Sequence, residues 1–183
     1  MDRREQLLEA LTDHVLAHGL IGLTLRPAAA ALGTSDRMLL YHFASRDALV
    51  SAVVSRANER AIAVVSSLPA APDVRLAVTR LWTAYGTEPL SSCLDVYCQA
   101  AAEGLIGREP YLSDVRASNE RWTRALRDYF VRSGAPVPRV DRVVTLVDSS
   151  LYGFHLDLTT DRPTELAQGV EDLASAAATL AAG

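Results

Sequence analysis

The sequence contains no lysine, only two cysteines and few aromatic residues, and its apolar runs are short. Cys93 and Cys98 are too few for a disulfide framework or a metal-ligand set, and at their spacing on a helix they point in different directions. We interpret them as small apolar core residues, with a redox sensor as the alternative. No run is long enough to cross a bilayer, and the charged first residues do not form a secretion signal. We therefore expect a cytoplasmic protein with no membrane partner.

Catalytic signatures are absent as well. The sequence has no H-E-x-x-H, no G-x-S-x-G, no Walker loop and no dinucleotide fingerprint. The four histidines and the scattered acidic residues form no recognisable catalytic or metal-binding set. We therefore expect a protein that is not an enzyme, with no cofactor and no metal. We attribute the exclusive use of arginine among the 18 basic residues to codon bias and give it no functional weight.

What the sequence does contain is a strong helical pattern. With 183 residues, 49% of them hydrophobic, the chain can bury a sizeable core. Glycine and proline gather between segments of helical periodicity, and no strand-like alternation persists, which predicts an all-α fold. The expected helices span about 3–18, 25–32, 35–42, 45–68, 73–87, 90–105, 111–133, 138–159 and 164–181.

The stretch "LGTSDRMLLYHFASRDAL" (residues 32–49) carries the clearest motif. Two short helices joined by a turn at Gly33 are typical of a helix-turn-helix. Leu32, Leu39 and Phe43 have the spacing of its buried face. Thr24, Ser35 and Ser45 are expected to cap the helices that follow them. The second short helix would then turn polar side chains outward.

That outward face suits DNA. Near the start of such a helix Arg37 can bind a guanine bidentately, and Asp36 could accept from a cytosine amino group. Helix N-terminal amides with Tyr, His and Arg side chains suit phosphates, and Arg46 is placed for the phosphate backbone. The predicted DNA-binding residues are Thr24, Arg26, Thr34, Ser35, Asp36, Arg37, Met38, Tyr41, His42 and Arg46.

The longer stretch "GLTLRPAAAALGTSDRMLLYHFASRDAL" resembles the N-terminal DNA-binding domain of the tetracycline-repressor (TetR-like) family of bacterial regulators. The resemblance covers about fifty residues, and the remainder matches in layout only. It implies a three-helix DNA-binding domain over 1–48 and a helical ligand-binding and dimerisation domain over 49–183, linked by a helix from about 45 to 68. It also implies a homodimer, a palindromic double-stranded DNA operator and a small-molecule effector that releases the DNA.

The last two expected helices carry apolar residues at alternating spacings of four and three. Such a repeat is typical of helices that pack side by side. The two helices could pair with each other or meet a second copy in a four-helix bundle, and the resemblance favours the second arrangement. The predicted dimer-interface residues are Val140, Val144, Val147, Leu151, Phe154, Leu158, Leu166, Val170, Leu173, Ala177 and Leu180.

Aromatic and polar side chains of the C-terminal part could line an effector pocket, with core filling as the alternative. Asn119 and Asp148 fall among apolar positions, where a polar group needs a partner or a ligand. We expect a small apolar or aromatic effector. The candidate pocket residues are Trp82, Tyr85, Tyr97, Gln99, Asn119, Trp122, Asp148, Tyr152 and His155.

A second interpretation stays open. The formal net charge is −4, and Leu40 stands where the family usually has a tyrosine that contacts phosphate. Both features are compatible with a helical dimeric interaction module that has lost specific DNA binding. A steep fall of DNA affinity with salt would argue against that module.

Overall fold

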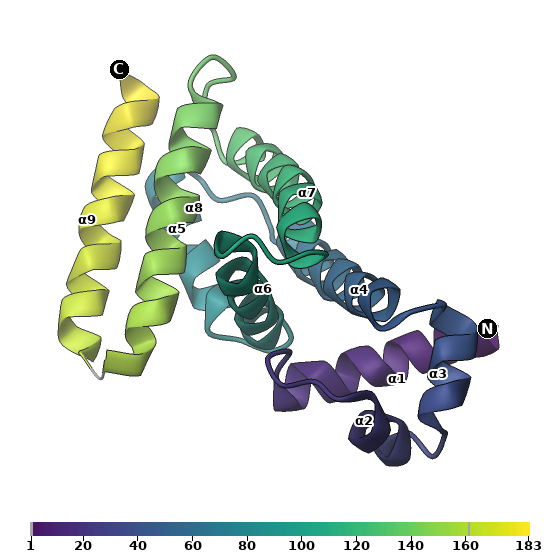
Figure 1. Cartoon of the computed structure of the whole chain (residues 1–183). Coiled ribbons are helices and arrows are strands. Elements are labelled where there is room, and N and C mark those ends of the chain that lie inside the picture. Colours follow the sequence, from purple (N-terminus) through teal and green to yellow (C-terminus); the bar gives the residue numbers. More distant parts are fainter. Residues whose placement is uncertain (1, 161) are drawn as a thin grey trace. The chain divides into compact units, whose positions relative to one another are not determined.

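A computed structural model describes residues 2–160 and 162–183. In this part of the chain all regular structure is helical (Figure 1). The elements are α1 Arg3–His18, α2 Leu25–Ala31, α3 Asp36–Phe43, α4 Arg46–Ser67, α5 Val74–Tyr85, α6 Leu90–Leu105, α7 Tyr111–Arg132, α8 Val140–Asp157, the 3-10 turn η1 Leu158–Thr160 and α9 Pro163–Ala182. The all-α prediction is confirmed, and every expected helix is present.

Local capping explains several of these boundaries. The Ser35 side chain accepts a hydrogen bond from Met38 N (3.2 Å), and Ser45 Oγ accepts from Ala48 N (3.0 Å), as predicted. The predicted cap at Thr24 is wrong, because its side chain makes no capping hydrogen bond although the residue occupies the N-cap position of α2. Thr24 is exposed, so water can satisfy the first amides of α2 in its place.

The chain packs as two units, which are described separately. Unit 1 comprises residues up to Ala61 together with Pro89–Glu120, and unit 2 comprises Ile62–Glu88 and Arg121–Gly183. Helices α4 and α7 each begin in unit 1 and end in unit 2, whereas α6 belongs wholly to unit 1. The division by packing therefore differs from the functional boundary expected after residue 48, which stays a prediction.

In unit 1, helix α1 supplies much of the core. Leu11 and Val15 of α1 and Leu39 of α3 are fully buried in this core. Each buried side chain of this size contributes roughly 2 kcal/mol of transfer free energy. On the edge of this core, α4 is tied to α1 by ion pairs. Arg56 pairs with Glu5 and Glu9 of α1, and Arg60 pairs with Glu9 and Asp13.

In unit 2, α9 packs against both α5 and α8. Most of the stripe predicted for the dimer interface is buried by this packing within one chain: Val140, Val144, Val147, Leu151, Leu166, Val170, Leu173 and Ala177 are buried, Phe154 and Leu180 are half-buried, and Leu158 is exposed. Gly169 lets α8 approach α9, since a Cβ there would lie 3.1 Å from Phe154 Cζ. Of the two arrangements that the sequence left open, pairing within the chain is present, and assembly with a second copy stays a prediction.

No helix in the described ranges is both long and apolar enough to span a membrane.

Candidate nucleic-acid interface and effector site

Helices α2 and α3 form the predicted helix-turn-helix. Gly33 makes the turn with φ +66°, and Thr34 N donates to Ala29 O (2.9 Å), which closes the end of α2. Leu39 and Phe43 anchor α3 in the core, as expected. Leu32, expected on the same buried face, is only half-buried because it already lies past the end of α2.

The opposite face of α3 is open to solvent. Tyr41 is 78% exposed, and Met38 and Leu40 are 43% and 38% exposed. Of the predicted DNA-binding residues, Thr24, Arg26, Ser35, Asp36, Arg37, Met38, Tyr41 and Arg46 are exposed, and Thr34 and His42 are half-buried. The structure therefore keeps the whole predicted set available at the surface of unit 1.

Local contacts organise the start and end of α3. Asp36 Oδ1 accepts from Arg37 N (2.8 Å), so this carboxylate is held beside the first turn. The rings of Tyr41 and His42 meet edge to face at 5.2 Å between centroids. Arg4 of α1 places its guanidinium 5.0 Å from the centre of the Phe43 ring, a cation–π contact that the sequence did not reveal because the two residues are far apart in the chain.

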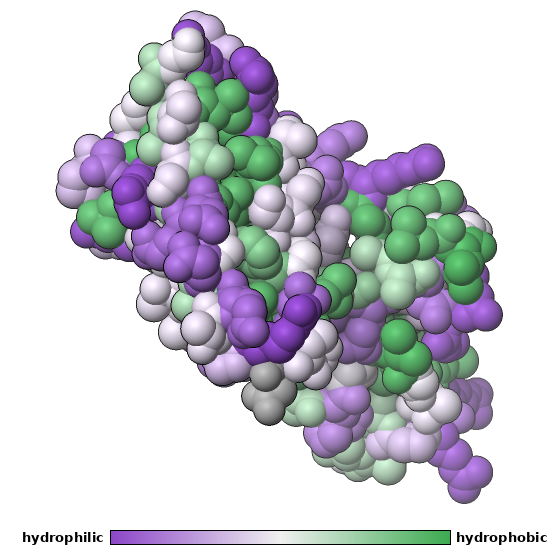
Figure 2. Space-filling view, turned by 90° about the vertical axis from the view of Figure 1, so that its left-hand side faces the viewer, coloured by the Kyte–Doolittle hydropathy of each residue, from purple (hydrophilic) through white to green (hydrophobic). Residues whose placement is uncertain are grey.

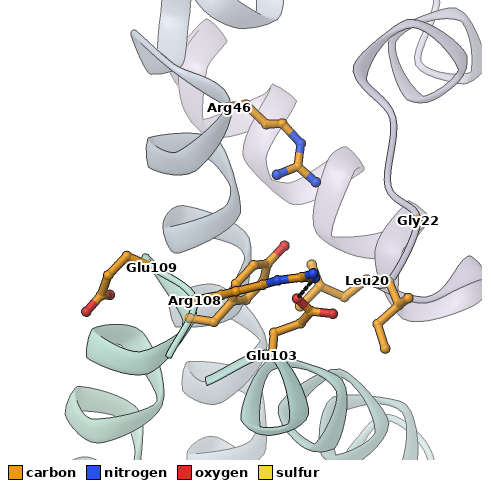
Figure 3. A pocket seen from close by; sticks show the side chains of 8 residues that line it. Leu20, Gly22, Arg46, Glu103, Arg108 and Glu109 are labelled. Atoms are coloured by element: carbon orange, nitrogen blue, oxygen red, sulfur yellow. Dashed lines mark hydrogen bonds and ion pairs between the residues drawn. The ribbon is translucent and has the colours of Figure 1, made fainter. Parts of the chain in front are cut away.

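Arg46 stands at a hollow rather than on the open face of α3. Its Nη2 donates to the Leu23 carbonyl (3.3 Å), and its side chain lines a hollow of about 370 Å³ (Figure 3). The other lining residues are Leu20, Ile21, Gly22, Glu103, Arg108, Glu109 and Tyr111, all from unit 1. Sequence reasoning missed this hollow, because its walls come from the α1–α2 loop, α4 and the α6–α7 connection.

Six of the nine predicted effector-pocket residues form one cluster in unit 2 around Tyr85. Its ring lies 6.2 to 6.4 Å, between centroids, from the rings of Trp82, Trp122, Tyr152 and His155. Asp148 completes the cluster by accepting from Trp122 Nε1 at 2.7 Å. Burial raises the pKa of the Asp148 carboxyl to about 6, although the Trp122 N–H opposes this shift.

The remaining three predicted pocket residues lie in unit 1. Gln99 Oε1 accepts from two successive backbone amides, Leu20 N (2.7 Å) and Ile21 N (2.9 Å), so it holds the end of α1 against α6. Tyr97 is half-buried on the same helix. Asn119, expected among buried apolar positions, is exposed, although it follows the helical spacing of the buried Trp122 and Leu126.

Among the described residues, no group of three or more His, Cys, Asp or Glu side chains is arranged to hold a metal ion.

No protein-family model matches this chain, and no curated protein matches it. Solved structures do match over nearly the whole length. The multidrug-binding protein EbrR with proflavin is 23% identical, with a TM-score of 0.69 over 95% of this chain and 99% of its own. A transcriptional regulator from Rhodococcus sp. Rha1 is 19% identical, with a TM-score of 0.75 over 96% of this chain and 95% of its own. A TetR-family regulator from Mesorhizobium loti is 15% identical, with a TM-score of 0.64 over 98% of both chains.

The chain has the TetR-family fold. The TetR-like structures that it matches have an N-terminal DNA-binding domain followed by a C-terminal ligand-binding domain. The helix-turn-helix of α2 and α3 occupies the N-terminal position of the TetR fold, and the aromatic cluster around Tyr85 belongs to the part that follows. The expectation of fold that the resemblance raised is therefore confirmed over nearly the whole chain and not only over its first fifty residues.

Proposed function

We propose that this protein is a ligand-responsive transcriptional regulator, a repressor, that binds a palindromic operator as a homodimer in a bacterial cytoplasm. The observation that carries the proposal is the exposed face of α3. Leu39 and Phe43 fix this helix in the core while Arg37 and Tyr41 point outward at the end of unit 1 that a TetR fold uses for DNA. Arg37 would read a guanine, and the amides at the start of α3 would hold a phosphate.

Dimerisation is supported by a second, exposed stripe on α8. Leu146, Ser149, Gly153 and Leu156 follow one another at helical spacing on the side turned away from the buried stripe, and Leu156 is 57% exposed. Nothing lies within 4 Å of a Cβ built on Gly153, so a helix of a second copy can approach closely there. Figure 2, which views the left-hand side of Figure 1, where α9 lies, shows green and near-white surface between purple, hydrophilic groups.

The effector class follows from the cluster around Tyr85. We place the effector there as a flat aromatic cation, which aromatic faces and a buried carboxylate at Asp148 can bind together. EbrR, a neighbour in fold, was crystallised with proflavin and with ethidium, both of which are ligands of this kind. Accommodating such a ligand requires the packed rings around Tyr85 to separate.

Release of DNA follows from a change of conformation. Effector binding must favour the conformer in which the two recognition helices no longer fit successive major grooves, about 34 Å apart. Helix α4 is the natural lever, because it begins in unit 1 beside the helix-turn-helix and ends in unit 2.

The experiment is selection of bound sequences from a random DNA pool, followed by a salt titration with the selected site. We expect a palindrome and a steep loss of affinity with salt. Arg37→Ala should weaken binding to the selected site by about ten-fold or more, with a much smaller effect on random DNA. Arg116→Ala, which removes an exposed arginine of α7, is the matched control and should change neither.

The alternative interaction module makes the opposite prediction. The exposed apolar side chains Met38 and Leu40 on α3 are the observation that favours it. A folded dimer that selects no DNA sequence at low salt would support the module and contradict the regulator.

A further inference from the structure

The hollow at Arg46 is distinct from the cluster around Tyr85, and it shares only Arg46 with the predicted DNA-binding residues. All the residues that line it belong to unit 1, whereas the aromatic cluster belongs to unit 2. Its volume of about 370 Å³ falls in the range of small-molecule sites. The walls come from the α1–α2 loop, the start of α4, the end of α6 and the α6–α7 connection, so a molecule bound there would touch four segments of the DNA-binding unit at once.

The charged groups that face the hollow favour an anion. The only polar contact that the described residues give to the Arg46 side chain is the neutral Leu23 carbonyl at 3.3 Å, so its positive charge is not balanced by a carboxylate. Arg108 Nη1 pairs with Glu103 Oε2 at 2.5 Å on the opposite wall (Figure 3). The Arg46 guanidinium points toward this pair and retains donors for a ligand.

The second acid of the hollow does not cancel this charge. Glu109 Oε2 accepts from Ser113 N (3.1 Å) and from Ser113 Oγ (2.8 Å), so it caps the start of α7. In Figure 3 its carboxylate is turned away from Arg46 and Arg108. The groups that face the hollow, two guanidiniums and the Glu103 carboxylate, therefore carry one net positive charge.

The rest of the lining comprises Leu20, Ile21 and Gly22 of the α1–α2 loop and Tyr111 at the start of α7. Leu20 and Ile21 line the hollow with their side chains, while their backbone amides are both held by Gln99 Oε1 of α6. A ligand with a short apolar part would contact these side chains and the buried Tyr111. It would thus act on the same junction of α1 and α6 that Gln99 holds together.

We propose that this hollow binds a small organic anion, a carboxylate or phosphate carried on a short apolar group, and that its binding weakens the hold of the protein on DNA. The regulatory half rests on the proposed function and on the prediction from the sequence that Arg46 contacts a DNA phosphate. An oxyanion that takes the Arg46 guanidinium with two charge-assisted hydrogen bonds removes that guanidinium from the DNA.

Binding is tested first without DNA, on the full-length protein, by calorimetric titration with benzoate and phenyl phosphate. Benzamide, which has nearly the shape of benzoate without its charge, should bind at least about ten-fold more weakly. Arg46→Gln and Arg108→Gln should each weaken benzoate binding by about ten-fold or more, because each removes a charged donor. Both arginines are exposed, so neither change is expected to unfold the chain, and circular dichroism checks this.

Two further variants sharpen this test. Glu103→Gln removes the acid that competes for Arg108 and should tighten benzoate binding, a gain that a merely structural role of Glu103 does not produce. Arg116→Gln, at an arginine that does not line the hollow, should leave benzoate binding unchanged. Absence of binding by both anions, equal binding of benzamide, or binding that survives Arg46→Gln and Arg108→Gln would each overturn the site.

The second arm measures affinity for the selected operator in benzoate and in chloride at equal ionic strength. We expect benzoate to weaken DNA binding by wild type more than chloride does, and Arg108→Gln to abolish the difference. Benzoate that binds without changing DNA affinity would overturn the regulatory half. A wild-type protein that binds no DNA would contradict the proposed function, while the first arm would still decide whether the anion site exists.

Discussion

At the scale of single residues, Asp148 is the most unusual group in the described chain. Its carboxyl lies among aromatic rings, accepts one hydrogen bond from Trp122 Nε1, and has a pKa raised to about 6 by burial. At neutral pH it is mostly ionised at a cost to stability that a bound cation would offset.

This cost makes stability depend on pH in a defined direction. Between about pH 4 and pH 6 the folded chain holds a proton at Asp148 that the unfolded chain has released, because the pKa is raised from 3.8 to about 6. This carboxyl therefore lowers the free energy of unfolding as pH rises through that window, by at most about 3 kcal/mol.

Asp148→Asn, which can still accept from Trp122, should remove this contribution and be more stable than wild type at pH 7.5. Urea unfolding of wild type and variant at pH 4.5 and pH 7.5 measures the free energy of unfolding. If this free energy changed between the two pH values by the same amount in both proteins, the result would contradict this account.

Cys98 gives a second prediction at this scale. Burial, and next the nearby Asp95 carboxylate, raise the pKa of its thiol to about 11, and Cys93 is buried. At pH 8 only about one Cys98 in a thousand is therefore a thiolate, the form that reacts with alkylating reagents. Iodoacetamide should modify Cys98 at least about 100-fold more slowly than free cysteine, and urea should restore the ordinary rate. Fast labelling of the folded protein would instead favour the redox-sensor interpretation.

At the scale of elements, the helix boundaries follow from local signals. The first helix and the helix over Leu90–Leu105 have the limits that the sequence predicts. Caps such as Ser35, together with glycines and prolines between helices, act over a few residues, so they can be identified without knowing the fold. Thr24 shows the limit of this reasoning, because an exposed N-cap residue need not bond to its own helix.

The turn between α2 and α3 is sensitive to a single methyl group. Gly33 has φ +66°, while nothing lies within 4 Å of a Cβ built there. Gly33→Ala should therefore destabilise the protein by about 1–2 kcal/mol through backbone strain alone, without a steric clash. Gly86→Ala is the matched control, since Gly86 has an ordinary φ of −84° and only an ordinary van der Waals contact. Thermal unfolding compares the two, and equal losses would show that strain at Gly33 is not the cause.

At the scale of the whole molecule, the proposed functions fall in different units. Unit 1 carries α3, the hollow at Arg46 and the Gln99 contact to the α1–α2 loop. Unit 2 carries the aromatic cluster and the exposed stripe on α8. Helices α4 and α7 each contribute residues to both units, and we propose them as the path by which a change in one unit reaches the other.

Assembly of two copies is testable on the exposed stripe. Gly153→Arg and Leu156→Arg should each turn the dimer into a monomer without unfolding it, because both positions are exposed in the single chain. The monomer should also lose most of its affinity for a palindromic site, which needs two recognition helices. Leu105→Arg, at a leucine that is 88% exposed on α6, is the control and should remain a dimer. Sedimentation velocity measures the outcome, and a dimer that tolerates both changes would place the interface elsewhere.

The sequence by itself determined the all-helical content, the limits of the helices to within about two residues and the helix-turn-helix, because periodicity, caps and turn glycines are local properties. It also identified the residues exposed on α3, since one helix face must be buried and the other is then left outside. Only the tertiary structure decided that the stripe beginning at Val140 is buried within one chain and that Gln99 holds the α1–α2 loop. It alone placed Arg46 at a hollow with Arg108. These contacts join residues far apart in the chain, and no local pattern encodes which distant surfaces meet.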